Sequence, residues 1–285
     1  MAVTTKVADA ELIGGPSALS GGWSRFFHLT WTLAVHEFKL RFFGSVLGYF
    51  WQLMRPLLLF GVLYVIFAVI LHIGKGTNYF PAVLLFNIVL YTFYAEATTG
   101  SVRSVVDRES IVRKIRFPRL VIPASVVLTA TFNLVLNVIV VLVFAAITGV
   151  TPHAGWLFMP LILVLLAAFT LGTAMLLSAL FVRFRDIQPI WEVVLQALFY
   201  ATPILYPVER VAQHSQTAAH LLMCNPVATL IQQARHALID PTAPSAADAI
   251  GGAAWLAIPA AIAIGGCALG FFVFNRTAPR IAEEL

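Results

Sequence analysis

The stretch "LVIPASVVLTATFNLVLNVIVVLVFAAITG", residues 120–149, contains no charged residue and is almost entirely apolar. A helix needs about 20 apolar residues to cross roughly 30 Å of hydrocarbon, and this run exceeds that length. Over the whole chain of 285 residues, 60% are hydrophobic and only 11% are charged. A soluble domain has about a quarter of its residues charged. The sequence therefore predicts an all-α polytopic membrane protein.

Six apolar runs are predicted to cross the membrane as helices. They cover residues 56–74, 80–98, 120–149, 156–182, 188–206 and 249–275. If the N-terminus is cytoplasmic, all Lys and Arg residues except Lys75, Arg210 and Arg235 fall on the cytoplasmic side. Cytoplasmic loops are enriched in these residues, so both termini are predicted to be cytoplasmic. This asymmetry accounts for the net charge of +5 without a nucleic-acid partner.

Residues 30–55 are predicted to form an amphipathic helix that lies in the headgroup plane on the cytoplasmic side. On a helix, Trp31, Phe38 and Phe42 fall on one side, and Arg41 lies away from that stripe. Pro56 is predicted to open the first span. The alternative interpretation is that residues 30–55 are an uneven start to the first span and not an interfacial helix. The segments 1–29 and 276–285 are predicted to be cytoplasmic tails, the first of them flexible.

The loop at 101–119 is predicted to couple the membrane domain to a cytoplasmic partner. It mixes both signs of charge, and its candidate contact residues are Asp107, Arg108, Glu109, Arg113 and Lys114. Mixed charge suits ion-paired contact with a partner, whereas a solvated membrane anchor is the alternative. A second, smaller contact is predicted at the short loop that follows the fourth span. Its residues are Arg183, Arg185 and Asp186.

Polar and aromatic residues inside the predicted spans are candidates for lining a transport path. They are Tyr64, Phe67, Tyr91, Tyr94, Asn133, Asn137, Glu192, Phe199 and Tyr200. Polar groups at membrane depth usually face protein or a wet cavity, and Tyr can both stack on a sugar and hydrogen-bond to it. The alternatives are helix–helix contacts for the asparagines, aromatic belts for the tyrosines and solvation at the interface for Glu192 and Glu96.

Four motifs in the chain resemble those of the permeases of type-2 ABC exporters, specifically the branch that moves polysaccharides such as O-antigen, capsule or teichoic acid. They are "RFFGSVLGYFWQLMRPLL" (41–58), "KIRFPRLVIP" (114–123), "RFRDIQPI" (183–190) and "FYATPILYP" (199–207). The resemblance covers about residues 30–275. It implies a homodimer in the bacterial plasma membrane that exports a lipid-linked glycan with two copies of an ATPase subunit.

The segment 207–248 is predicted to form two short helices outside the membrane-spanning runs. Pro207 and Asn225–Pro226 break its weakly amphipathic pattern. The resemblance implies that these helices are re-entrant, dip into the membrane and close the outer mouth of the path.

No enzymatic motif is visible in the sequence. "HIGKGT" (72–77) lacks the first glycine of a P-loop and the Ser or Thr after its lysine, so ATP and Mg are expected to bind a separate ATPase subunit. Cys224 and Cys267 fit no metal or redox spacing, and no metal or cofactor is predicted in this chain. Two alternatives remain open: an exporter of drugs or small lipids with the same fold, and a membrane lipid-sugar transferase.

Overall fold

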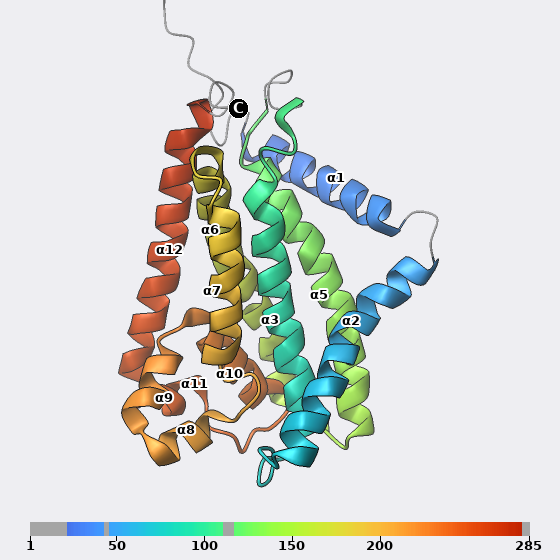
Figure 1. Cartoon of the computed structure of the whole chain (residues 1–285), viewed down its shortest axis with the longest axis vertical. Coiled ribbons are helices and arrows are strands. Elements are labelled where there is room, and N and C mark those ends of the chain that lie inside the picture. The colour runs from blue at the N-terminus through green and yellow to red at the C-terminus, as the bar shows by residue number, and fades with distance from the viewer. Residues whose placement is uncertain (1–21, 43–45, 111–116, 281–285) are drawn as a thin grey trace, which may run out of the picture.

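The computed structural model describes residues 22–42, 46–110 and 117–280, and every regular element in these ranges is a helix (Figure 1). The longer helices are α1 (Trp23–Phe42), α2 (Val46–Tyr64), α3 (Phe80–Arg103), α5 (Val121–Ile147), α6 (Met159–Arg183), α7 (Ile187–Ala201), α10 (Pro226–Leu238) and α12 (Ala257–Thr277). The shorter ones are η1 (Val65–Ile70), η2 (Ala154–Phe158), α8 (Val208–His214), α9 (Gln216–Met223), α11 (Ala246–Ile250), η3 (Ala253–Leu256) and η4 (Ala278–Arg280). The predicted all-α class is confirmed.

Five helical segments in the described ranges are long and apolar enough to cross a membrane. They are Phe50–Ile70, Phe80–Arg103, Val121–Ile147, Ala154–Arg183 and Ala253–Thr277. Each overlaps one of the predicted spans, so the sequence pattern located these helices correctly. The chain is therefore a multi-pass membrane protein.

The predicted span at 188–206 is the exception, and a count of six is not confirmed. In its place lies α7, which has 15 residues and is roughly 22 Å long, shorter than the hydrocarbon core of about 30 Å. Pro203 explains the early end of the helix, because a proline disfavours helical conformation in the residue before it. Thr202 is accordingly extended, with φ −86° and ψ 138°. The chain nevertheless passes from the end of α6 to the opposite end of the molecule through α7 (Figure 1).

The N-terminal boundaries differ from those predicted. α1 begins at Trp23, so part of the predicted flexible tail is helical, and it ends at Phe42 instead of running to residue 55. α2 begins at Val46 and contains Pro56 in its interior, so the proline does not open the first span. The segment long enough to cross the membrane starts at Phe50, six residues before Pro56. A proline removes one hydrogen bond from a helix and does not always end it.

α1 packs across α5 through aromatic side chains on its apolar stripe. Trp31 and Phe38 both meet the ring of Phe132 edge to face, with centroid distances of 5.4 and 5.7 Å. The hydroxyl of Thr129 donates to the backbone carbonyl of Ala34 at 3.3 Å. α1 is therefore amphipathic, as predicted from the sequence, and it is also attached to the helix bundle through α5. The side chain of Phe42 lies outside the described residues.

α3 is the central helix of the molecule. It packs against α2, α5, α6, α7 and α10, and it is the most buried of the five long apolar helices although it is also the least apolar of them. Its polar residues Asn87 and Glu96 are therefore placed among neighbouring helices instead of facing lipid.

α6 and α12 pack at very short range through glycine. A Cβ atom at Gly270 would lie 2.1 Å from the carbonyl oxygen of Gly172, and a Cβ at Gly172 would lie 2.7 Å from the Cα of Cys267. Small residues allow two helix backbones to approach in this way and gain van der Waals contact. The attachment of α12 to the bundle therefore depends on these two positions.

Residues 207–250 form four helices, α8 to α11, where the sequence predicted two short helices over 207–248. They gather at the end of the molecule opposite to the end of α12 (Figure 1). The additional helix starts arise from polar capping residues: Ser215, Asn225 and Ser245 each accept a backbone N–H of the following turn. Such caps satisfy donors that a helix start leaves free, so short helices become stable between breaks.

A buried ion pair holds these short helices together. Arg235 of α10 is 3% exposed and donates two hydrogen bonds to the carboxylate of Glu209 on α8, at 3.0 and 2.8 Å. Asp240 lies 4.0 Å from the same guanidinium. Although Arg235 was grouped with the basic residues outside the cytoplasm, its side chain points into the protein.

Candidate functional site

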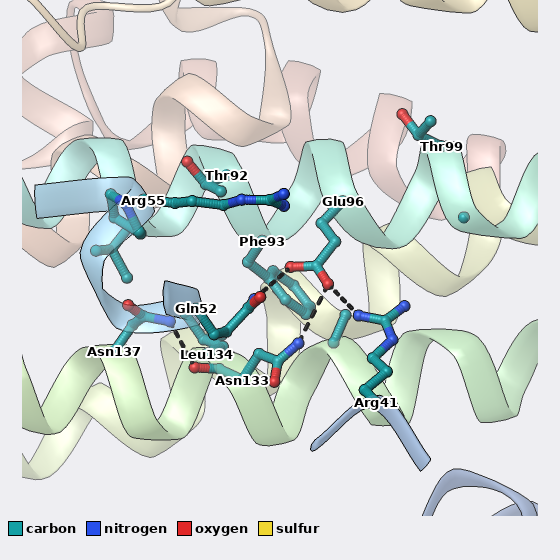
Figure 2. Close-up of a pocket in the computed structure, with 14 residues that line it drawn as sticks. Arg41, Gln52, Arg55, Thr92, Phe93, Glu96, Thr99, Asn133, Leu134 and Asn137 are labelled. Atoms are coloured by element: carbon teal, nitrogen blue, oxygen red, sulfur yellow. Dashed lines mark hydrogen bonds and ion pairs between the residues drawn. The ribbon is translucent and has the colours of Figure 1, made fainter. Parts of the chain in front are cut away.

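A polar cavity of about 450 Å³ lies between α1, α2, α3 and α5 (Figure 2). Its polar lining residues are Arg41, Gln52, Arg55, Thr92, Glu96, Thr99, Asn133 and Asn137. The volume is within the range of small-molecule sites, which hold roughly 300–1,000 Å³. The cavity places the guanidinium groups of Arg41 and Arg55 and the carboxylate of Glu96 beside the membrane-crossing helices.

Glu96 of α3 is the hub of this cavity, and Figure 2 shows three side chains turned towards its carboxylate. Arg41 of α1 forms an ion pair with it at 2.5 Å, and Asn133 of α5 and Gln52 of α2 donate to it at 3.1 and 3.4 Å. The carboxylate thus joins four helices. A charge at this depth is costly unless it is paired, and this network provides the pairing.

The two asparagines of α5 line the same cavity, as their spacing of four residues suggested. Asn133 links α5 to α3 through Glu96, whereas the amide of Asn137 donates to the carbonyl of Asn133 in its own helix at 2.9 Å. Asn133 therefore acts as a contact between helices, the alternative that the sequence left open. Within the described ranges, Asn137 forms no hydrogen bond to another helix.

Arg55 is the positively charged residue of the cavity that forms no ion pair with another described residue. Its side chain is exposed and runs along α3 between Thr92 and Glu96 (Figure 2). Neither an ion pair nor a hydrogen bond joins it to another described residue. Sequence reasoning missed Arg55 and Gln52 as site residues because it placed the first span after them. Two polar residues at 52 and 55, within an otherwise apolar run, were the available signal.

Tyr91 and Tyr94, predicted to line the path, are buried within the chain. They are 5% and 3% exposed, and the hydroxyl of Tyr91 donates to the carbonyl of Leu195. The ring of Tyr94 stacks on Phe169 at 5.8 Å, and Phe199 meets Tyr91 edge to face at 5.3 Å. This placement favours packing between α3, α6 and α7. Among the other candidates, Tyr64 and Phe67 are half-buried against the same core.

α7 presents polar and aromatic side chains on the outside of the chain. Glu192 and Gln196 are exposed, Gln188 donates to Glu192 at 3.2 Å, and Tyr200 is 58% exposed. These residues recur at a spacing of four, so they form one stripe along the helix. Together, Gln188, Glu192, Gln196 and Tyr200 form the α7 stripe.

The predicted coupling residues gather at one end of the molecule. Residues 104–110 after α3 and the loop after α6 both lie at the end of the molecule where α12 finishes (Figure 1). Asp107 is exposed and pairs with Arg103 at 3.7 Å, while Arg185 lies over the ring of Phe181 at 5.1 Å. Arg183 and Asp186 are exposed, and Glu109 is half-buried. Arg113 and Lys114 lie outside the described residues.

Arg108 is directed into the protein. It forms an ion pair with Glu37 of α1, and it donates to the carbonyl of Ile122 and the hydroxyl of Ser125, each at 3.4 Å. Its side chain is 18% exposed, and burial lowers the pKa of its guanidinium. Arg108 therefore ties the loop after α3 to α1 and to the start of α5.

Comparison with known proteins places the chain in a family. The family model described as ABC-2 type transporter matches residues 28–239, which is most of the chain. The chain is 30% identical over 200 residues to the O-antigen export system permease protein RfbA of Myxococcus xanthus, with 70% of this chain and 76% of that protein covered. It is 29% identical over 217 residues to a protein of the same name from Klebsiella pneumoniae, with 76% and 82% covered. The chain therefore belongs to the ABC-2 type transporter family.

Proposed function

We propose that the chain is the permease subunit of an ATP-driven exporter that moves a lipid-linked polysaccharide out of the cytoplasm. The names of its relatives, O-antigen export permeases, support a polysaccharide over a drug or a small lipid. The family supports an ATPase partner, which would bind ATP and Mg. The membrane is the bacterial plasma membrane, with both termini in the cytoplasm.

The α7 stripe is the observation that carries the proposed path. A carboxylate and two amides at membrane depth are costly in lipid, yet they point out of the chain. A second copy packed near this face would place the stripe beside a wet path on the two-fold axis of a homodimer. Tyr200 would offer such a path a ring for the apolar face of a sugar and a hydroxyl for its polar rim.

The non-helical turn after α7 supports a sixth passage through the membrane. Residues 202–205 are buried, and the amide of Asn87 donates to the carbonyls of Pro203 and Ile204, each at 3.4 Å. Irregular backbone is tolerated at membrane depth only where protein satisfies its polar groups. α7 and this turn would together cross the bilayer, and α8 to α11 would dip into its outer side as a re-entrant gate.

Changing the α7 stripe tests the function and the path together. In a strain that lacks this chain, the wild type is expected to restore polysaccharide at the cell surface. The double variant Glu192→Leu, Tyr200→Ala is expected to reach normal abundance and to lower surface polysaccharide at least tenfold. Its side chains are exposed, so packing loses little, whereas the path loses a polar and a stacking group. Immunoblots measure abundance, and labelling of whole cells measures export.

Trp255→Ala provides the matched control, because Trp255 is 56% exposed on η3 at the start of α12, away from α7. This control variant is expected to export at the wild-type rate. Normal export by the α7 double variant would remove the stripe from the path. A wild type that restores no surface polysaccharide would contradict the function itself.

Charge reversal at the exposed coupling residues tests the ATPase contact. The triple variant Asp107→Arg, Arg185→Glu, Asp186→Arg is expected to co-purify with at least tenfold less ATPase, at unchanged permease abundance. Three changes are combined because one exposed ion pair contributes only about 0.2–1 kcal/mol. Lys75→Glu is the control, since this exposed lysine lies between η1 and α3, away from both loops. Full ATPase recovery with the triple variant would count against a coupling role for these residues.

A further inference from the structure

We propose that the cavity between α1, α2, α3 and α5 binds the phosphate group of a lipid-borne ligand, with the guanidinium of Arg55 as its main contact. The inference rests on the proposed function, under which the lipid that carries the glycan is such a ligand. It adds a substrate-recognition site that is separate from the α7 stripe.

The charges of the cavity favour an anion. Arg41 is neutralised by Glu96 at 2.5 Å, so the positive charge of Arg55 is left over. A guanidinium offers five N–H donors in a planar fork that fits the oxygens of a phosphate. Because Arg55 is exposed and extends along α3 beside Glu96, these donors are available at the mouth of the cavity (Figure 2).

Uncommitted polar groups around Arg55 fit the rest of such a ligand. Thr92 and Thr99 line the cavity, and neither hydroxyl bonds to another described residue. Threonine hydroxyls can both donate to and accept from the hydroxyls of a ligand. Hydroxyls next to a phosphate are the groups of a glycosylated phosphate ester.

The depth of the cavity also fits a lipid phosphate. Glu96 lies seven residues before the end of α3, which places it roughly 10 Å along the helix axis from that end. Taking the end of α3 as the membrane surface, Glu96 lies near the boundary between the headgroups and the acyl chains. A phosphate could therefore reach Arg55 while its lipid chain stays in the bilayer.

Calorimetric titration of the purified permease in an uncharged maltoside detergent tests the proposal. The probe is dodecyl phosphate below its micelle-forming concentration. We expect saturable binding to the wild type and roughly tenfold to hundredfold weaker binding to Arg55→Gln, because a charge-assisted hydrogen bond is lost. Arg55→Lys is expected to bind with intermediate affinity, since an ammonium keeps the charge without the fork. Arg276→Gln, another exposed arginine, is the matched control and should bind as the wild type does.

Two competitors identify the source of the phosphate. Inorganic phosphate is expected to compete at least tenfold more weakly than dodecyl phosphate, because it lacks the lipid chain. Phosphatidylglycerol, a bulk anionic lipid, is also expected to compete weakly. Equal competition by inorganic phosphate would overturn the assignment to a lipid, and equal competition by phosphatidylglycerol would overturn the assignment to the glycan carrier.

Export in cells separates this proposal from the proposed function. Arg55→Gln is expected to remain abundant and to lower surface polysaccharide, with lipid-linked glycan accumulating inside. Unchanged affinity of Arg55→Gln for dodecyl phosphate would mean that Arg55 only extends to the membrane interface, and the phosphate site would be withdrawn. The proposed function would still stand if the wild type restored export in the same strain.

Discussion

Gly270→Ala is expected to remove most of the folded protein from the membrane, whereas Gly265→Ala on the same helix leaves its amount unchanged. The added Cβ at position 270 would lie 2.1 Å from the carbonyl oxygen of Gly172, a distance that no side-chain rotation relieves. α6 and α12 must then separate along their whole contact. Overpacking typically costs 1–3 kcal/mol, and a backbone contact belongs at the upper end, about 3 kcal/mol.

Gly265 is a matched control because a Cβ there meets no atom within 4 Å. Alanine also has the better helix propensity, so Gly265→Ala should hold or raise the thermal midpoint of the purified protein. Size-exclusion chromatography in detergent and thermal unfolding would measure both variants. Equal thermal midpoints for the two variants would contradict the close backbone contact between α6 and α12.

Arg235→Leu is expected to lower the free energy of unfolding by about 3–5 kcal/mol and to abolish export. Removing one partner of a buried ion pair leaves the other charges without compensation. Here the carboxylates of Glu209 and Asp240 would remain, and Asp240 is only 5% exposed. α8 and the turn after α10 would lose their attachment to α10. Thermal unfolding and the surface polysaccharide assay would measure the two effects.

Two further variants separate charge from geometry at this ion pair. Arg235→Lys keeps the positive charge but cannot reproduce the two-pronged contact with Glu209, so it should destabilise less than Arg235→Leu. Adding Glu209→Leu to Arg235→Leu should restore part of the lost stability, because one orphaned charge is removed. A wild-type thermal midpoint for Arg235→Leu alone would refute a structural role for the pair.

The apolar runs predicted most of the fold because hydrocarbon thickness fixes the length of a spanning helix. α3 and α5 start within a residue of their predicted positions, because Pro81 and Pro123 lie in the first turns of these helices, where a proline is tolerated. The errors occur where local backbone chemistry prevails over hydropathy. Pro56 stays inside α2 instead of starting it, and Pro203 ends α7 before it can span the bilayer.

The candidate site was only partly predictable, because its contacts join residues distant in sequence. The spacing of Asn133 and Asn137 showed that they share a face, but nothing in the spacing pairs Glu96 with Arg41, 55 residues away. Likewise, charge counting could not show that Arg108 turns inward to Glu37. Tyr91 was assigned to a path from its depth and from the ability of a tyrosine to stack on a sugar and hydrogen-bond to it, whereas its burial depends on contacts with α7.

The central position of α3 has a consequence for how the protein is made. α3 is synthesised before α5 and α6, the helices that cover it. Until the later segments arrive, Asn87 lacks the carbonyls of Pro203 and Ile204, and Glu96 lacks Asn133, although Arg41 and Gln52 have already been made. Unpaired polar groups in an inserting helix are costly. α3 would insert stably only once later segments have joined it. Biogenesis would therefore require the nascent helix to be sheltered from lipid, and truncation after α3 should yield a poorly inserted chain.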